Sequence, residues 1–181
     1  MCSSDLIYLL LLWVVMTRTL PRQPAGAEAL RRPALVALVL ALVTMAAGAF
    51  VAGLDAGLSY NTFPLMDGKL VPDGILMLKP AWRNFFENVA TVQFDHRVLA
   101  IATVIAVLAL VLSSTRLSLP LPARAARAIY AALVMVLVQA TLGITTLIFV
   151  VPTPLAACHQ AGALILVATL LWVVFETRKP A

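Results

Sequence analysis

The sequence predicts an all-α protein, a polytopic bundle of membrane-spanning helices. Apolar residues make up 62% of the 181 residues and charged residues only 12%, whereas a typical soluble domain carries about 25% charged residues. The charges are also clustered, so that long segments carry none. These segments approach the ~20 residues that cross a bilayer as a helix, and only helices satisfy their own backbone groups in lipid.

Four complete spanning helices are expected, at about residues 34–54, 94–112, 125–150 and 155–175. A fifth apolar run, Leu6–Met16, is too short to span a bilayer. It lacks the basic segment that begins a cleavable signal peptide. We interpret this run as the truncated end of a preceding helix, and residues 1–6 as a candidate cloning or assembly artefact.

The chain is accordingly divided into three regions. These are a truncated helix with a cytoplasmic loop at 1–33, a four-helix half at 34–177 with an outer loop at 55–93, and a cytoplasmic tail at 178–181. In the outer loop, aromatic residues within Pro80–Val89 predict a short amphipathic helix at the membrane interface. Such a helix serves either as an anchor for the next spanning helix or as a lid over a site.

Basic residues lie in alternate loops and predict the orientation of the bundle. On one side lie Arg18, Arg22, Arg31, Arg32, Arg116, Arg124, Arg127, Arg178 and Lys179. The positive-inside rule makes this side cytoplasmic, or the matrix side in a mitochondrion. Because these loops account for the net charge of +5, membrane lipid is expected as a partner and nucleic acid is not.

A weak internal repeat relates two helical hairpins. Gly48 lies 16 residues after Arg32, and Gly143 lies 16 residues after Arg127. In each hairpin, the second helix carries a histidine near its outer end. Repeats of this kind often place a binding site at their shared interface.

The two histidines, His96 and His159, are the candidate functional residues. Arg116 lies 20 residues beyond His96, and Arg178 lies 19 residues beyond His159, which corresponds to roughly 30 and 29 Å of helix. The imidazoles are thus expected at matched depth on helices that run in the same direction. This arrangement suits the axial ligation of one haem iron by both imidazoles. The alternative is a pair of interfacial histidines satisfied by water and lipid headgroups.

Two polar residues, Arg97 and Gln139, are further candidates for a role beside the histidines. Arg97 could pair with a haem propionate, or its side chain could extend to the interface. Gln139, deep in the third spanning helix, could form an interhelical hydrogen bond. The two cysteines, Cys2 and Cys158, are expected at different depths, so no disulfide is predicted, and no Cys-x-x-Cys spacing occurs.

Two long stretches resemble a known family. They are AGLDAGLSYNTFPLMDG at Ala52–Gly68 and WRNFFENVATVQFDHR at Trp82–Arg97. Together with Gln139–Leu147 and His159-Gln160, they closely resemble the heme A synthase family in its alphaproteobacterial and mitochondrial form. The resemblance covers about residues 34–175.

The resemblance implies an eight-helix protein made of two similar four-helix halves, of which this chain matches the second. The family oxidises a methyl group of haem O to the formyl group of haem A, for use by cytochrome c oxidase. The residues that match His96 and His159 are regarded as axial ligands of a haem b cofactor. The catalytic residues are expected in the first half, so this fragment alone is expected to be inactive.

The resemblance also implies partners and a location. Haem O is the expected substrate, and haem O synthase, cytochrome c oxidase assembly proteins and a second copy of the chain are candidate partners. The expected location is the bacterial inner membrane, or the mitochondrial inner membrane in a eukaryote. The alternative functions are a b-type membrane cytochrome that transfers electrons without synthase activity, and a transporter or assembly factor that holds no cofactor.

Overall fold

The computed structural model describes residues 3–21, 26–116 and 120–178 of the chain. Its helices are α1 (Ser3–Thr19), α2 (Arg31–Gly53), α3 (Asn84–Glu87), α4 (Val89–Thr115), α5 (Ala123–Ile148) and α6 (Thr153–Glu176). Three short 3-10 helices are η1 (Glu28–Leu30), η2 (Ala56–Leu58) and η3 (Ala81–Arg83). Within the described residues no strand forms, and only Met66 and Lys69 make an isolated bridge. The predicted all-α class is confirmed.

Four helices are long and apolar enough to cross a membrane, which confirms the four predicted spans. The largest difference in bounds is at α4, which begins at Val89 and not near Phe94. The side chain of Asn88 accepts a hydrogen bond from the backbone nitrogen of Thr91 and so caps the helix. Hydropathy misses this first turn because it is partly polar.

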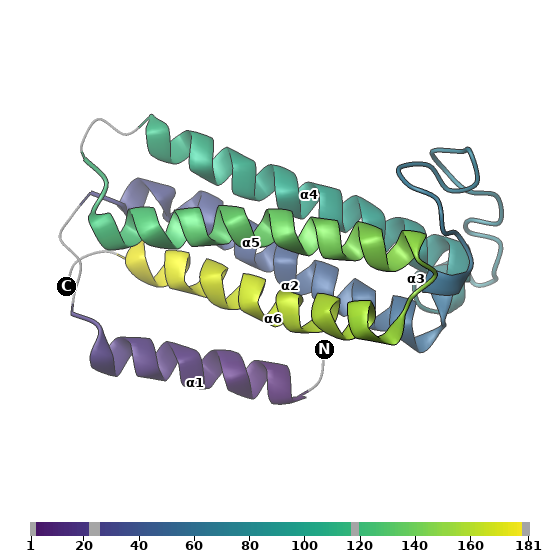
Figure 1. Ribbon diagram of the computed structural model, residues 1–181, viewed down its shortest axis with the longest axis horizontal. Coiled ribbons are helices and arrows are strands. Elements are labelled where there is room, and N and C mark those ends of the chain that lie inside the picture. Colours follow the sequence, from purple (N-terminus) through teal and green to yellow (C-terminus); the bar gives the residue numbers. More distant parts are fainter. Residues whose placement is uncertain (1–2, 22–25, 117–119, 179–181) are drawn as a thin grey trace.

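The four long helices form two antiparallel hairpins, α2 with α4 and α5 with α6 (Figure 1). The hairpins pack together through contacts of α2 with α6 and of α4 with α5. Helix α1 lies against α6. The connections rich in basic residues meet at one end of the bundle, and the outer loop lies at the other end (Figure 1). The prediction on disulfide pairing involves Cys2, and the predicted cytoplasmic tail includes Lys179. Both residues lie outside the described residues.

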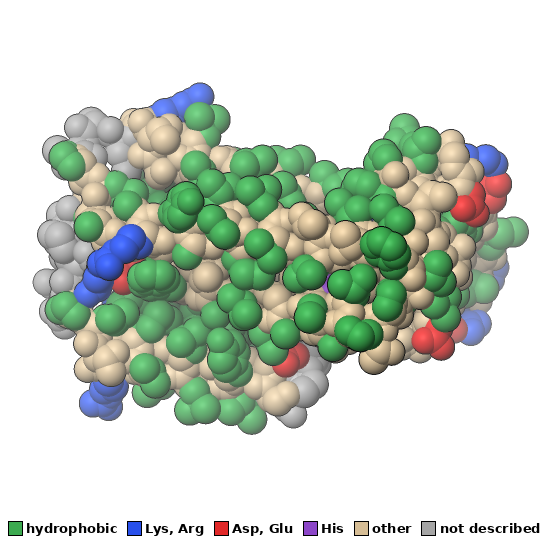
Figure 2. All heavy atoms as spheres, viewed as in Figure 1, with side chains coloured by type: hydrophobic (Ala, Val, Ile, Leu, Met, Phe, Trp, Pro, Cys, Tyr) green, Lys and Arg blue, Asp and Glu red, His purple; other side chains and the backbone are tan. Residues whose placement is uncertain are grey.

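The tightest packing lies in the half of the bundle near the basic end. Small residues such as Ala37 on α2 and Ala128 and Ala132 on α5 are fully buried there, and small side chains let membrane helices approach closely. Val107 and Leu110 of α4 and Leu170 of α6 complete this core. Hydrophobic side chains cover α5 and α6 between the ends, and most charged side chains lie at the ends (Figure 2).

A buried glutamate joins several elements at the basic end. Glu176 of α6 forms an ion pair with Arg124 of α5 at 3.2 Å and accepts a hydrogen bond from Trp172 Nε1 at 2.9 Å. Arg124 also donates to the carbonyl of Pro21 at 2.7 Å, which follows α1. The guanidinium of Arg124 therefore ties α5 to α6 and to the segment after α1.

The outer loop is folded around two asparagines. The fully buried Asn84 donates to the carbonyls of Leu78 and Ala81 and accepts from the backbone nitrogen of Leu78. Asn88 donates to the side chain of Asn84 and to the carbonyl of Gly74. The amphipathic helix predicted in this loop is present as η3 and α3, with its aromatic residues exposed. The loop is thus an ordered cap on the outer end.

Replacing Arg124 by Met should lower the stability of the bundle. The substitution removes the ion pair with Glu176 and the hydrogen bond to Pro21, and a hydrogen bond to a charged group contributes about 2 kcal/mol. We expect a lower thermal midpoint of the protein in lipid nanodiscs, measured by circular dichroism. Arg127→Met is the matched control, since Arg127 is exposed on the same helix. Equal midpoints of the two variants would contradict this role.

Candidate functional site

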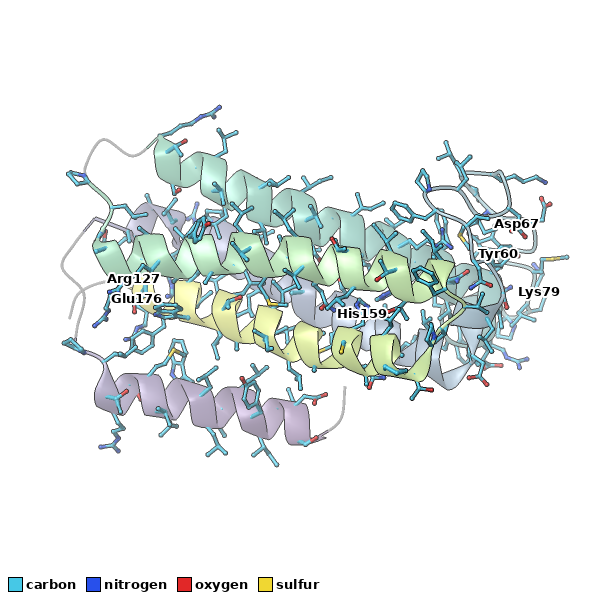
Figure 3. The ribbon with its side chains drawn as sticks, in the orientation of Figure 1. Tyr60, Asp67, Lys79, Arg127, His159 and Glu176 are labelled. Atoms are coloured by element: carbon cyan, nitrogen blue, oxygen red, sulfur yellow. The ribbon has the colours of Figure 1, made fainter. Side chains whose placement is uncertain are left out.

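The two histidines occupy equivalent places near the outer ends of two helices that run in the same direction. His96 is the eighth residue of α4 and His159 is the seventh residue of α6. Figure 3 shows His159 between Glu176 at the basic end and Tyr60 of the outer loop. Both histidines are half-buried. Only a small histidine surface is visible between the helices (Figure 2).

Each histidine packs against a glycine of its own hairpin. A Cβ atom added to Gly48 of α2 would lie 3.0 Å from Cε1 of His96. A Cβ atom added to Gly143 of α5 would lie 2.9 Å from Cε1 of His159. A side chain at Gly143 would force the imidazole to shift, and one at Gly48 would press tightly against it. The internal repeat predicted from the sequence therefore corresponds to a repeated contact between a glycine and a histidine.

One ring nitrogen of each histidine has a partner. Nδ1 of His96 lies 3.1 Å from the carbonyl oxygen of Thr44, and Nδ1 of His159 lies 3.0 Å from Nε2 of Gln139. Within the described part of the chain, neither Nε2 atom forms a hydrogen bond. The structure thus holds each ring by Nδ1 and leaves Nε2 for another partner.

Gln139 forms the interhelical hydrogen bond that the sequence suggested. Its Nε2 atom donates to the carbonyl of His159 at 2.8 Å, which joins α5 to α6. Its Oε1 atom is buried and has no hydrogen-bond partner. The partner of His96 gave no signal in the sequence, because Thr44 contributes a backbone carbonyl and not its side chain.

Arg97 is directed toward the outer loop. Its guanidinium donates to the carbonyls of Tyr60 and Thr62, at 2.8 Å each, and its Nε atom is buried without a partner. Gln93, one turn earlier on α4, also donates to the carbonyl of Tyr60. Asn61 donates to the carbonyl of Leu147 at the end of α5. These bonds hold the loop over the ends of α4 and α5.

A shallow apolar groove includes Asp95, the residue before His96, in its lining. It has a volume of about 190 Å³ and lies between α2, α3 and α4. Its lining is apolar except for Asp95, and it includes Phe50 and Phe85. Within the described residues, no group of three or more His, Cys, Asp or Glu side chains could hold a bare metal ion. Two imidazoles alone suit a metal that already has other ligands.

Comparison with known proteins gives a consistent result. The family model described as cytochrome oxidase assembly protein (COX15-CtaA) matches residues 1–171. The chain is 44% identical to a protein named heme A synthase from Nitrosospira multiformis, covering 96% of this chain and 49% of that protein. It is 51% identical to a heme A synthase from Mesorhizobium japonicum, covering 79% of this chain and 39% of that protein.

A mammalian relative is equally similar. The chain is 44% identical to bovine heme A synthase COX15, covering 98% of this chain and 43% of that protein. The chain thus spans about half the length of the curated relatives it matches. No solved structure matches the chain.

Adding a methyl group at Gly48 should destabilise the protein. Alanine favours a helix over glycine by up to about 1 kcal/mol, but its Cβ would meet the His96 ring, and overpacking costs about 1–3 kcal/mol. We expect Gly48→Ala to lower the thermal midpoint. Gly53→Ala is the control, because no atom lies within 4 Å of a Cβ at that position of α2. A midpoint for Gly48→Ala at or above that of the control would show that the contact is not tight.

Replacing Arg97 by Met should loosen the outer loop. The variant loses charged hydrogen bonds to two loop carbonyls, worth about 2 kcal/mol each when buried. We expect faster backbone hydrogen exchange in residues 60–66, measured by mass spectrometry. Arg83→Met is the control, since Arg83 pairs with Glu87 on the exposed side of the loop. If both variants exchange alike in this segment, Arg97 does not anchor the loop.

Proposed function

The chain belongs to the heme A synthase family, and we propose that it acts in the conversion of haem O to haem A. In that reaction a methyl group of haem O is oxidised to a formyl group for use in cytochrome c oxidase. The names of the relatives support a role in haem A biosynthesis. The catalytic residues of the oxidation are proposed to lie in the half of the relatives that this chain does not match.

The proposed task of this chain is to hold a haem b between His96 and His159. The observation that carries this proposal is the pair of Nε2 atoms without hydrogen bonds, on rings that are held by Nδ1. A hydrogen bond at Nδ1 fixes the orientation of an imidazole that ligates metal through its other nitrogen. His96, whose Nδ1 faces a carbonyl, would hold a haem iron as it stands, and His159 would do so once its Nδ1 donates to Gln139.

The chain's own residues would position the cofactor and control its surroundings. The Thr44 carbonyl orients His96, and Gly48 and Gly143 let the rings lie against α2 and α5. When bound, the haem supplies one-electron redox chemistry. A haem held by both imidazoles would have no open coordination position and would suit electron transfer better than oxygen activation. We place it as an electron relay to the substrate half of the protein.

The location and partners follow from the same proposal. The bundle would lie in the bacterial inner membrane, or in the mitochondrial inner membrane of a eukaryote, with its basic end facing the cytoplasm or matrix. Haem O is the proposed substrate of the whole protein. Haem O synthase, assembly proteins of cytochrome c oxidase and a second copy of the chain are proposed partners.

A b-type membrane cytochrome is the alternative function. It is favoured by one observation, that the described site offers two imidazoles and no third candidate ligand or acid cluster. Pigment extraction from cells that express the whole protein separates the two functions. Haem A, or haem O carrying a hydroxylated methyl group, is expected only from a synthase.

Removing either histidine should abolish six-coordinate haem b. We expect His96→Ala and His159→Ala, reconstituted with iron protoporphyrin IX in nanodiscs, to lose the low-spin absorbance spectrum of the unmodified chain. Cys158→Ser is the control, because Cys158 is exposed next to His159. Undiminished haem b absorbance in both histidine variants would overturn the ligand assignment.

A further inference from the structure

The two imidazoles are held by different kinds of partner at equivalent positions. Thr44 lies four residues before Gly48, and Gln139 lies four residues before Gly143. In the first hairpin the partner of Nδ1 is a backbone carbonyl. In the second it is a side-chain amide, which can offer either its NH₂ group or its oxygen.

The carbonyl of Thr44 permits only one neutral tautomer of His96 in this contact. A carbonyl oxygen accepts hydrogen bonds and cannot donate them. Nδ1 of His96 must therefore carry the ring proton, and Nε2 keeps its lone pair. The neutral His96 ring can therefore ligate a metal through Nε2 without a change of tautomer.

Gln139 places His159 in the opposite state. The Nε2 atom of Gln139 lies 2.8 Å from the His159 carbonyl and 3.0 Å from Nδ1 of His159. An amide nitrogen has two hydrogens and no acceptor capacity, so it donates to both atoms. Nδ1 of a neutral His159 then carries a lone pair, and the ring proton lies on Nε2, which cannot ligate in that form.

The oxygen side of the amide is unsatisfied and closely enclosed. Oε1 of Gln139 is buried without a partner, and such an unsatisfied acceptor is costly. A Cβ atom on Gly162 of α6 would lie 2.3 Å from this oxygen. Only glycine at position 162 leaves the space that the amide occupies.

We propose that Gln139 is a positioning residue that selects the tautomer of His159 by the orientation of its amide. With the nitrogen toward the ring, His159 is withheld from ligation. With Oε1 facing the ring instead, Nδ1 donates its proton to Oε1 and the lone pair of Nε2 becomes available. The amide must then move away from the His159 carbonyl, because two oxygens cannot share that contact. His96 is then the permanent ligand and His159 the conditional one. This inference rests on the proposed haem site.

The first test uses the whole chain reconstituted with iron protoporphyrin IX. In Gln139→Glu, the side chain can accept the Nδ1 proton but cannot donate as an amide does. We expect a low-spin ferric spectrum and a midpoint potential shifted downward, because a stronger acceptor gives the ring more imidazolate character. In Gln139→Met no acceptor remains, and the potential should shift upward with a larger high-spin fraction.

Two further variants separate positioning from general packing. Gly162→Ala leaves Gln139 in place but displaces its amide, and it should reproduce the shift of Gln139→Met. Gln160→Met is the matched control, because Gln160 adjoins His159 but is exposed. Wild-type potential and electron paramagnetic resonance spectrum in both Gln139 variants would overturn the inference.

The second test needs neither haem nor a substitution. The chain contains only two histidines, so ring ¹⁵N labelling of the haem-free protein reports two imidazoles. We expect one ring protonated at Nδ1 and the other at Nε2. Two rings protonated at Nδ1 would overturn the inference even if the Gln139 variants fail to fold. By contrast, an unchanged haem spectrum in His159→Ala would overturn the proposed ligand and not the tautomer assignment.

Discussion

The contact between each histidine and a glycine of the neighbouring helix determines the geometry of the site. At Gly48 and Gly143, a Cβ atom would come within about 3 Å of an imidazole carbon. The missing side chains let α2 and α5 approach α4 and α6 at the depth where the rings lie. This approach brings the Nδ1 atoms within reach of Thr44 and Gln139. A polar ring inside an apolar bundle needs such a partner, because lipid supplies none.

The sequence was sufficient for the fold class, and it singled out His96 and His159 as candidate ligands without giving their surroundings. Long uncharged segments located the spanning helices. Hydropathy did not locate the start of α4, because the residue that caps it, Asn88, is polar. Counting residues from basic anchors placed His96 and His159 at similar depth. The partner of His96 is a backbone carbonyl, which leaves no signature in a sequence. The direction of Arg97 depends on the fold of a long loop, which local patterns do not determine.

The two ends of the bundle differ in burial and in hydrogen bonding. Near the basic end, alanines and branched residues are fully buried, and the pair of Glu176 with Arg124 joins three segments. Near the outer end, two buried amide oxygens remain without partners in the described part of the chain, those of Gln93 and Gln139. Unsatisfied buried groups are costly, and such costs are common at functional sites.

The connections of the two hairpins differ in a way that bears on how the protein arose. From glycine to histidine, the first hairpin runs over 48 residues and the second over 16, yet both bring the same pair of residues into contact. The short turn after α5 shows that this contact does not require a long connection. If the hairpins descend from one duplicated ancestor, the two copies have diverged in the length of this connection while the contact between glycine and histidine has stayed the same.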